Sequence, residues 1–180
     1  MKIIAFTGMP FSGKTEAVKI AKDRNIPIFR MGEVVWDEVK SRDLELNDEN
    51  VGFIANEMRI KHGKDVWAKR TVEKIRHSNY NDLIIIDGIR NIEEIDFFRK
   101  NLGDDFILIS VEVSDEIRYE RAMSRGRSDD SCDIEKIKKR DHRELSWGID
   151  AVMASADIVV SNELSIDVFR KKVRKILDKV

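Results

Sequence analysis

Short apolar runs alternate along this chain with longer stretches in which apolar residues recur every three or four positions. A short continuous apolar run is typical of a strand that is buried on both faces of a parallel sheet, whereas the longer spacing predicts a helix. Strands are predicted at residues 3–6, 26–29, 83–86, 106–113 and 158–160. Because strands and helices alternate, we expect an α/β fold in which helices cover a five-stranded parallel sheet.

Two connections between predicted strands are longer than a single crossover helix requires. Residues 114–156 hold two helical stretches, and residues 31–78 hold three predicted helices, at 33–40, 49–61 and 65–76. We expect both segments to form insertions near the carboxyl edge of the sheet, where open α/β folds bind their ligands. A last amphipathic helix is predicted at 166–177, and residues 1–180 are expected to form a single domain.

Composition narrows the classes of function. The 180 residues include 33 basic and 34 acidic side chains, so the net charge is -1 although charged residues make up 37% of the chain. A dedicated nucleic-acid or membrane-surface binder normally carries a clear basic excess, so membrane binding is not expected and nucleic-acid binding is left to local basic patches. The single cysteine, Cys132, excludes a disulfide within the chain and fits a reducing compartment. The apolar runs are shorter than a membrane span and the N-terminus lacks the pattern of a signal peptide, so we expect a cytoplasmic protein.

Residues 8–15 read GMPFSGKT, which matches the phosphate-loop motif G-x-x-x-x-G-K-[ST] directly after a predicted strand and before a helical pattern. Glycine at both ends lets the backbone wrap an anion, and the following helix directs its free amides at the phosphates. Lys14 would then reach the β- and γ-phosphates of ATP, and the Thr15 hydroxyl would bind Mg²⁺. The predicted cofactor-binding residues of this segment are Gly8, Pro10, Phe11, Ser12, Gly13, Lys14, Thr15 and Glu16.

A second oxygen ligand for the metal is predicted at Asp87, which follows the apolar run 83–86. A carboxylate at the end of a neighbouring strand holds Mg²⁺ directly or through water in P-loop enzymes. The alternative is structural, because Asp is a favoured cap residue and Asp87 could cap the helix that starts near Asn91. The separation of several residues between the two positions weakens that alternative.

Three further motifs carry a likeness to a known family. Residues 87–90 read DGIR, residues 126–130 read GRSDD, and residues 138–140 read KKR. With the phosphate loop and the helical insertion, these motifs resemble nucleoside monophosphate kinases of the adenylate kinase type. Such kinases carry D-G-[FI]-P-R and, in the short-lid UMP/CMP kinases, G-R-x-D-D followed by K-R. The run RDHRELSWG at 140–148 and the chain length are more closely similar to a little-characterised archaeal group of adenylate-kinase-related proteins, which has also been grouped with the dephospho-coenzyme A kinases.

The resemblance implies a P-loop NTPase fold, a three-layer sandwich in which residues 31–78 bind the acceptor and residues 114–147 form a short lid. ATP and Mg²⁺ would be the cofactors, and a nucleoside monophosphate, with AMP favoured, would accept the phosphoryl group. Arg90 would clamp the acceptor phosphate, because a guanidinium donates two parallel hydrogen bonds to phosphate oxygens. The predicted catalytic residues are Lys14, Arg90, Arg127, Arg140 and Arg143, and the resemblance adds Arg121 and Arg125 as nucleotide contacts.

The arginines of the predicted lid can also be interpreted from their neighbouring residues, without the resemblance. Arg121 and Arg125 lie four positions apart among acidic residues in a predicted helix, so surface ion pairing explains them as well as nucleotide contact does. Arg140 and Arg143 adjoin a basic, helix-like stretch that is typical of a solvated face. Arg127 follows a glycine in a predicted loop, which favours a binding role.

One departure from adenylate kinases concerns the acceptor. Those kinases place an arginine a few residues after the second strand, at a position where this chain has Trp36. Either another arginine of the insertion holds the acceptor phosphate, with Arg70 and Arg59 as candidates, or the acceptor differs from the usual one. Trp36, Trp67 and Trp147 either stack on a base or pack within the protein.

The leading functional hypothesis is Mg²⁺-dependent phosphoryl transfer from ATP to a nucleoside monophosphate. The alternative acceptor is dephospho-coenzyme A, although the acidic motif typical of those enzymes is not apparent after the second strand. An alternative of another class is an ATP-gated assembly factor or slow ATPase that acts on a protein or RNA partner. The missing arginine at Trp36, together with the basic stretch 136–140, would favour it. The sequence leaves the base preference and the oligomeric state open.

Overall fold

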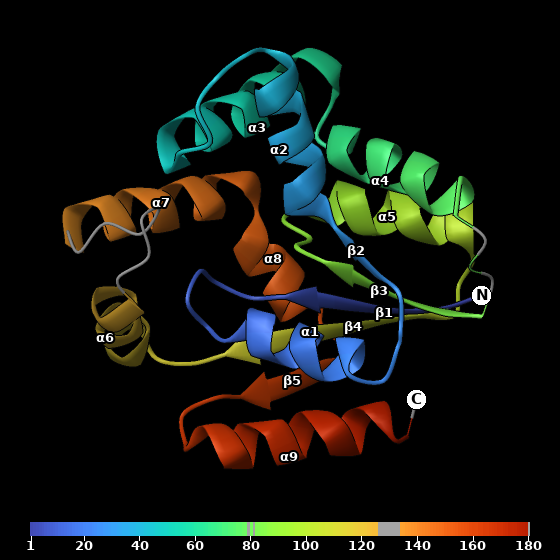
Figure 1. Cartoon of the computed structure of the whole chain (residues 1–180), viewed down its shortest axis with the longest axis vertical. Helices are drawn as coiled ribbons and strands as arrows, with labels where there is room; N and C mark the ends of the chain where they lie inside the picture. Colours follow the sequence, from blue (N-terminus) through green and yellow to red (C-terminus); the bar gives the residue numbers. More distant parts are fainter. Residues whose placement is uncertain (79, 81, 126–133, 180) are drawn as a thin grey trace.

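A single parallel sheet organises the chain. The computed structural model describes residues 1–78, 80, 82–125 and 134–179, without the side chain of Arg125. The sheet has the order β2-β3-β1-β4-β5, and every neighbouring pair is parallel. The strands are β1 (Lys2–Thr7), β2 (Ile28–Arg30), β3 (Leu83–Asp87), β4 (Phe106–Glu112) and β5 (Ile158–Ser161). The predicted α/β class with five parallel strands is therefore confirmed (Figure 1).

Helices cover the sheet on both faces, which produces three layers (Figure 1). Alternation along β1 explains this, since Ile4 and Phe6 belong to one buried cluster and Ile3 and Ala5 to the other. The first cluster is completed by α1 (Lys14–Lys22) and α9 (Ile166–Leu177). The second is completed by α2 (Met31–Ser41), α3 (Asp48–His62), α4 (Val66–Arg76), α5 (Ile92–Leu102) and α8 (Ile149–Ala154).

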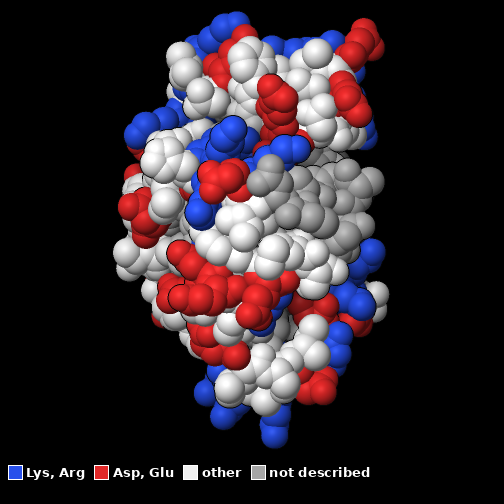
Figure 2. All heavy atoms as spheres, turned by 90° about the vertical axis from the view of Figure 1, so that its left-hand side faces the viewer, with Lys and Arg blue, Asp and Glu red and all other residues white. Residues whose placement is uncertain are grey.

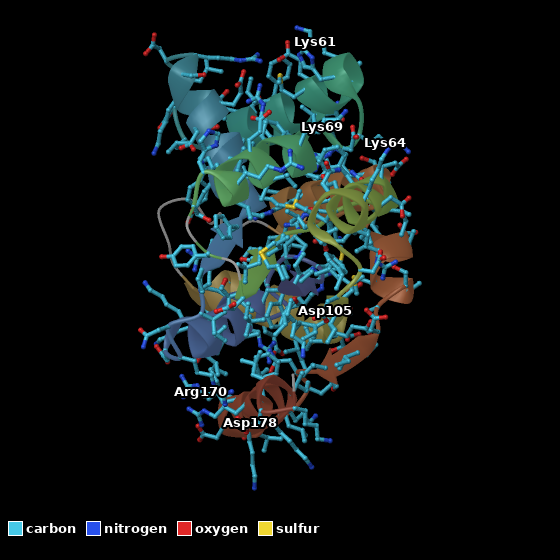
Figure 3. All side chains as sticks on the ribbon, turned by 90° about the vertical axis from the view of Figure 1, so that its right-hand side faces the viewer. Lys61, Lys64, Lys69, Asp105, Arg170 and Asp178 are labelled. Carbon is cyan, nitrogen blue, oxygen red and sulfur yellow. The ribbon has the colours of Figure 1, made fainter. Side chains whose placement is uncertain are left out.

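The first predicted insertion consists of α2, α3 and α4, at the opposite end of the molecule from α9. Figure 3 shows the separation, with Lys61, Lys64 and Lys69 at one end and Arg170 and Asp178 at the other. The bounds of the three helices agree with the predicted ranges within two residues. The largest difference is at the start of α2, which begins at Met31 directly after β2.

Trp67 packs the insertion into the core on this face of the sheet. It is fully buried, and its indole Nε1 donates a hydrogen bond to the Ala55 carbonyl at 3.2 Å. Of the two readings of this tryptophan, the structure therefore supports packing. Trp36, in contrast, is 44% exposed on α2.

The second insertion contains α6 (Asp115–Arg125), α7 (Ile134–Trp147) and α8, so the described part of it holds one helix more than predicted. Gly148 separates α7 from α8 with φ +100°, a conformation that L side chains rarely adopt. Helix α7 therefore ends there and α8 turns back toward the sheet (Figure 1). The GRSDD motif at 126–130, which includes Arg127, lies outside the described residues.

None of the helices in the described ranges combines the length and the apolarity that a bilayer span requires.

Two leucines that differ in burial should differ in how much their substitution lowers the free energy of unfolding. Leu108 in β4 is fully buried, whereas Leu164 is 62% exposed. Leu108→Ala should lower the free energy of unfolding by about 2–5 kcal/mol, because it removes buried methyl groups and leaves a cavity. Leu164→Ala should change it by less than about 0.5 kcal/mol. Urea denaturation measures both, and equal effects would contradict the assignment of Leu108 to the core.

Candidate active site

The phosphate loop joins the end of β1 to the start of α1, and its backbone needs glycine at both ends. Gly8 has φ +138° and Gly13 has φ +104°. A Cβ atom on Gly8 would lie 2.4 Å from the Val111 carbonyl oxygen, and one on Gly13 would lie 2.2 Å from Asn162 Nδ2. Any other residue at these positions would force neighbouring groups apart. The loop is therefore a close-fitting turn whose helix begins at Lys14.

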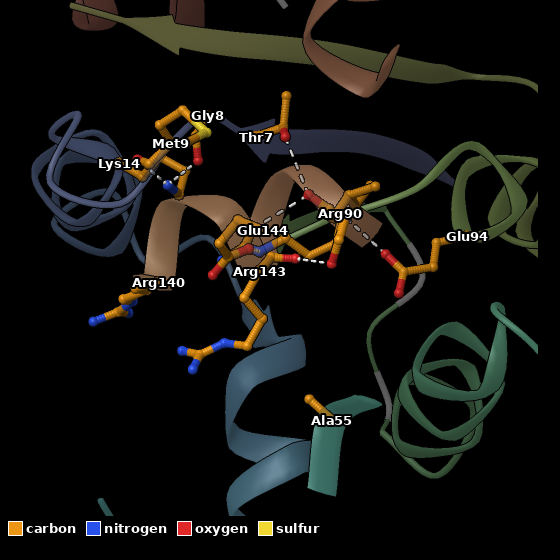
Figure 4. Close-up of polar contacts among 12 residues, drawn as sticks. Thr7, Gly8, Met9, Lys14, Ala55, Arg90, Glu94, Arg140, Arg143 and Glu144 are labelled. Carbon is orange, nitrogen blue, oxygen red and sulfur yellow. Dashed lines mark hydrogen bonds and ion pairs between the residues drawn. The ribbon is translucent and has the colours of Figure 1, made fainter. Parts of the chain in front are cut away.

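Lys14 lies across the loop that precedes it. Its Nζ donates hydrogen bonds to the carbonyl oxygens of Gly8 and Met9, the latter at 2.9 Å (Figure 4). Burial lowers the pKa of Lys14 to about 7, and the nearby charge of Arg90 acts in the same direction. Asp87 and Glu144 oppose this shift, so cations and carboxylates both gather around the lysine.

Asp87 ends β3 beside the phosphate loop. It is paired in register with Phe6 of β1 and with Arg30 of β2. Burial raises the pKa of Asp87, against the influence of Lys14 and Arg90. The capping alternative does not hold, because it is Asn91 whose side chain caps α5 by accepting a hydrogen bond from the Glu94 amide at 2.9 Å.

A magnesium ion would depend on few protein ligands here. In the described part of the chain, no cluster of three or more histidine, cysteine or carboxylate side chains is placed to hold a metal. Thr15, in the first turn of α1, and Asp87 supply hydroxyl and carboxylate oxygens on adjoining elements. These donors fit Mg²⁺, which usually keeps several waters and takes only one or two carboxylates together with substrate phosphates.

Arg90 follows β3 and is held on several sides. Its Nε pairs with Glu144 Oε2 of α7, and its backbone amide donates a hydrogen bond to Glu94 Oε2 at 2.7 Å (Figure 4). Its Nη1 donates to the Ile89 carbonyl at 3.3 Å. The structure therefore places Arg90 near enough to Lys14 for their charges to interact, and Glu144 is a partner that the sequence did not indicate.

Helix α7 carries Arg140 and Arg143 to the amino end of α3. Arg143 Nη2 donates to both carboxylate oxygens of Asp48, at 2.8 and 2.9 Å. Arg140 Nε lies 3.5 Å from Asp48 Oδ1, and its guanidinium lies 5.6 Å from the centre of the Phe11 ring. Gly52 allows this approach, because a Cβ there would lie 2.4 Å from Arg143 Nη1. These two arginines are thus not simply solvated; they connect α7 to the first insertion and to the phosphate loop.

The two candidate arginines of the first insertion lie in different places. Arg59 is buried, donates to Glu94 Oε1 at 3.0 Å, and lies 4.4 Å from the ring centre of Trp147. Arg70 instead donates to Glu38 at 2.6 Å and lines a groove of about 600 Å³ between α2 and α4. Arg59, which shares Glu94 with Arg90, is therefore the one that belongs to the cluster around the loop.

Arg121 has one contact and one free donor. Its Nη2 donates to the Asn162 carbonyl at 2.8 Å, whereas its Nη1 is buried and has no hydrogen-bond partner among the residues described. A buried donor without a partner is costly, so this atom is suited to a bound group. The side chain of Arg125, for which a nucleotide contact is predicted, lies outside the described residues.

Sequence reasoning missed Arg118 and Asp141. Arg118 on α6 is 2% exposed, and donates to both carboxylate oxygens of Asp141 on α7, at 3.0 and 2.7 Å. The same guanidinium donates to the Pro10 carbonyl of the phosphate loop at 3.1 Å and to Asp115. In the sequence both residues lie in helices rich in charged side chains, so the sequence pattern did not distinguish them from solvent-exposed charges.

Asn162 is a further residue that the sequence did not single out. It follows β5, is 6% exposed, and donates from Nδ2 to the Ser12 carbonyl at 2.8 Å. The side chain that would collide with a Cβ on Gly13 therefore also fixes the loop by a hydrogen bond.

The chain is similar in sequence to known proteins. A family model described as an AAA domain matches residues 7–138. A UPF0200 protein of Methanosarcina barkeri is 45% identical over 177 residues, which cover 98% of this chain and 95% of that protein. The chain belongs to the UPF0200 family.

Two solved structures resemble this UPF0200 chain in fold. A shikimate kinase from Aquifex aeolicus matches with a TM-score of 0.53 at 20% identity, covering 98% of this chain and 96% of that one. TT1252 from Thermus thermophilus matches with a TM-score of 0.65 at 17% identity, covering 99% and 97%. Together with the phosphate loop, these likenesses assign a P-loop kinase-like fold, and they support this wider group rather than the adenylate kinases in particular.

The buried Arg118–Asp141 pair of the UPF0200 chain yields a stability prediction. Arg118→Met should lower the free energy of unfolding by about 3–5 kcal/mol, because it leaves the buried Asp141 carboxylate without its cationic partner. Arg24→Met, which removes an exposed pair with Asp178, should cost about 1 kcal/mol or less. Urea denaturation of the two variants tests the contrast, and a loss below 1 kcal/mol in Arg118→Met would show that the buried pair is dispensable.

Proposed function

We propose that this chain transfers the γ-phosphoryl group of ATP, with Mg²⁺, to a nucleoside monophosphate, with AMP as the favoured acceptor. The observation that carries the proposal is the position of Arg90, beside Lys14 of the phosphate loop and under α7. An arginine at that point faces the place where a phosphate held by the loop would meet a second phosphate. Its planar fork suits such an oxygen-rich partner.

The donor half of the site is the phosphate loop. Its backbone amides and the amino end of α1 would bind the phosphates of ATP, and Lys14 would exchange the carbonyls of Gly8 and Met9 for phosphate oxygens. Thr15 and Asp87 would hold Mg²⁺, which neutralises charge on the transferring group when bound. Arg121, with its free Nη1, would contact the nucleotide near Asn162.

The acceptor half lies between α7 and the first insertion. Residues 31–78 would bind the acceptor and residues 114–147 would close over it as a lid. Arg90, with Arg140 and Arg143 from α7, would meet the charge that develops on the phosphoryl group, and Arg127 is assigned the same role from its motif alone. The work of the protein is then positioning and electrostatic stabilisation, with little covalent chemistry.

The surface charge supports a small anionic ligand over a polyanion. On the face that carries α7, basic side chains gather at the level of that helix, and a larger group of acidic side chains lies at the level of α6 (Figure 2). A nucleic-acid backbone would meet repulsion from the second group. The single cysteine and the near-neutral balance of charges fit a cytoplasmic enzyme.

The activity is tested with ATP, Mg²⁺ and a panel of acceptors that contains the four common nucleoside monophosphates and dephospho-coenzyme A. Phosphorylation of a monophosphate is expected, and Lys14→Ala should reduce it by about 10²–10³-fold, because a donor to the transition state is lost. Lys19→Ala, on the exposed side of α1, is the matched control and should retain the wild-type rate.

Three results would contradict the proposal. Formation of 3′-phosphorylated coenzyme A alone would indicate the alternative acceptor. ATP hydrolysis that ignores every monophosphate but rises with RNA or a partner protein would indicate the assembly factor or slow ATPase. Wild-type turnover in Lys14→Ala would remove the loop from the reaction.

The low pKa of Lys14 predicts proton uptake on ATP binding. In the free protein Lys14 is mostly neutral at pH 8, since its pKa is about 7. Bound phosphates favour the charged form and raise this pKa, so ATP binding should take up a proton at pH 8 and affinity should fall as pH rises above 7. Calorimetry in two buffers of different ionisation enthalpy measures the uptake, and Lys14→Met should abolish it. Equal proton uptake in both proteins would refute the assignment.

A further inference from the structure

The guanidinium of Arg90 is only partly engaged. Its Nε pairs with Glu144 and its Nη1 reaches the carbonyl of the neighbouring Ile89, but no hydrogen bond joins its Nη2 to a described residue. A guanidinium has five N–H donors in one plane, so fixing the Nε edge also fixes the direction of the remaining donors. Arg90 lies close enough to Lys14 and Asp87 to influence the pKa of both.

Glu144 is a buried, charged partner. Its side chain is 5% exposed. Burial acts to raise the pKa of Glu144, but Arg90, Arg140 and Lys14 outweigh it, so the pKa lies below its ordinary value and the group is ionised at neutral pH. The carboxylate and the Arg90 guanidinium form an ion pair, and their attraction is stronger at this buried position than it would be in bulk water.

The helix that carries Glu144 is connected to two further parts of the site. Asp141 reaches the phosphate loop through Arg118, which binds the Pro10 carbonyl. Arg143 reaches Asp48 of α3. Glu144, on the same helix, pairs with Arg90, which follows β3. The contact with Arg90 therefore depends on the position of α7.

We infer that Glu144 is a positioning residue, which holds the Nε edge of Arg90 so that its remaining donors face the acceptor phosphate when α7 is docked on the phosphate loop. The inference rests on the proposed function for the identity of the acceptor, but not for the contact itself. Its physical basis is preorganisation, since an arginine side chain that is already oriented loses less freedom when it binds phosphate.

A rival role for Glu144 would have the opposite effect. An ionised carboxylate beside Arg90 can instead act as an internal anion that competes with the acceptor phosphate. Removal of the charge would then strengthen acceptor binding, whereas removal of a positioning residue weakens it. Glu144→Gln separates the two roles, because it keeps the size of the side chain and loses the charge.

The first experiment needs no substrate. The Arg90 Nε–H signal is identified in ¹H–¹⁵N NMR spectra of the free protein by its absence in Arg90→Lys. In Glu144→Gln this signal should shift and exchange faster with solvent, whereas Glu93→Gln, which removes the exposed partner of Lys64, should leave it unchanged. Should Glu144→Gln fail to fold, Glu144→Asp keeps the charge on a shorter arm and should shift the same signal. An unchanged Arg90 Nε–H signal in the folded variant would overturn the inference.

The second experiment is a double-mutant cycle on acceptor use, with wild type, Glu144→Gln, Arg90→Ala and the double variant. Glu144→Gln should lower kcat/KM for the acceptor about tenfold, mainly through KM, and leave KM for ATP within about twofold. In the Arg90→Ala background it should have no further effect, because Glu144 acts through Arg90. A merely structural role would add to the effect of Arg90→Ala and would overturn the inference, as would tighter acceptor binding in Glu144→Gln.

The two proposals fail in different ways. Absence of phosphorylation of every monophosphate by the wild type, with ATP bound, would refute the proposed function. The NMR comparison then decides alone whether Glu144 holds Arg90, since it uses the free protein.

Discussion

Pairing of buried charges across elements is the interaction on which this site depends. The interior holds Arg118 with Asp141 and Arg59 with Glu94, each joining two different helices. A charge withdrawn from water is tolerated when a partner and further hydrogen bonds satisfy it. Helix α7 contributes Asp141 to the first of these pairs, and its Glu144 and Arg143 pair with Arg90 and Asp48. Its place over the phosphate loop is therefore set by charge pairing rather than by a large apolar face.

The sheet supplies the complementary constraint. Parallel pairing of β1 with β3 and of β3 with β2 brings the carboxyl ends of three strands to one edge. The phosphate loop, Asp87 and Arg30 follow from that register, because each of them ends or continues one of these strands. Open α/β sheets bind ligands at such an edge. The part of the site formed by the phosphate loop, Asp87 and Arg30 therefore follows from the sheet topology. The two insertions add the helical part.

The sequence was informative where a local pattern determines local structure. Continuous apolar runs predicted all five strands, and the glycines at positions 8 and 13 predicted a loop that the structure bears out in their positive φ angles. The sequence pattern did not predict the break between α7 and α8, where the turn depends on one glycine at position 148. They also gave no means of choosing between Arg59 and Arg70, because both lie in charged helices and differ only in the partners that the fold brings near them.

The long-range charge pairs could not be predicted for a similar reason. Glu144 and Arg90 are more than fifty residues apart, and Arg118 and Asp141 lie on two different helices of the second insertion. In a chain with 37% charged residues, any arginine has many possible carboxylate partners. Burial selects among them, and burial is a result of the whole fold.

The indole of Trp147 has an optical consequence. Guanidinium groups of Arg59 and Arg143 lie 4.4 and 5.8 Å from its ring centre, and its Nε1 donates to Asn56 at 3.2 Å. Cations this close to an aromatic ring alter its electronic surroundings. Trp67 is fully buried on α4 and Trp36 is 44% exposed on α2, so Trp147 is the tryptophan that α7 carries. Trp147 is thus an intrinsic fluorophore at the contact between the two insertions, and its emission wavelength depends on the distance between them.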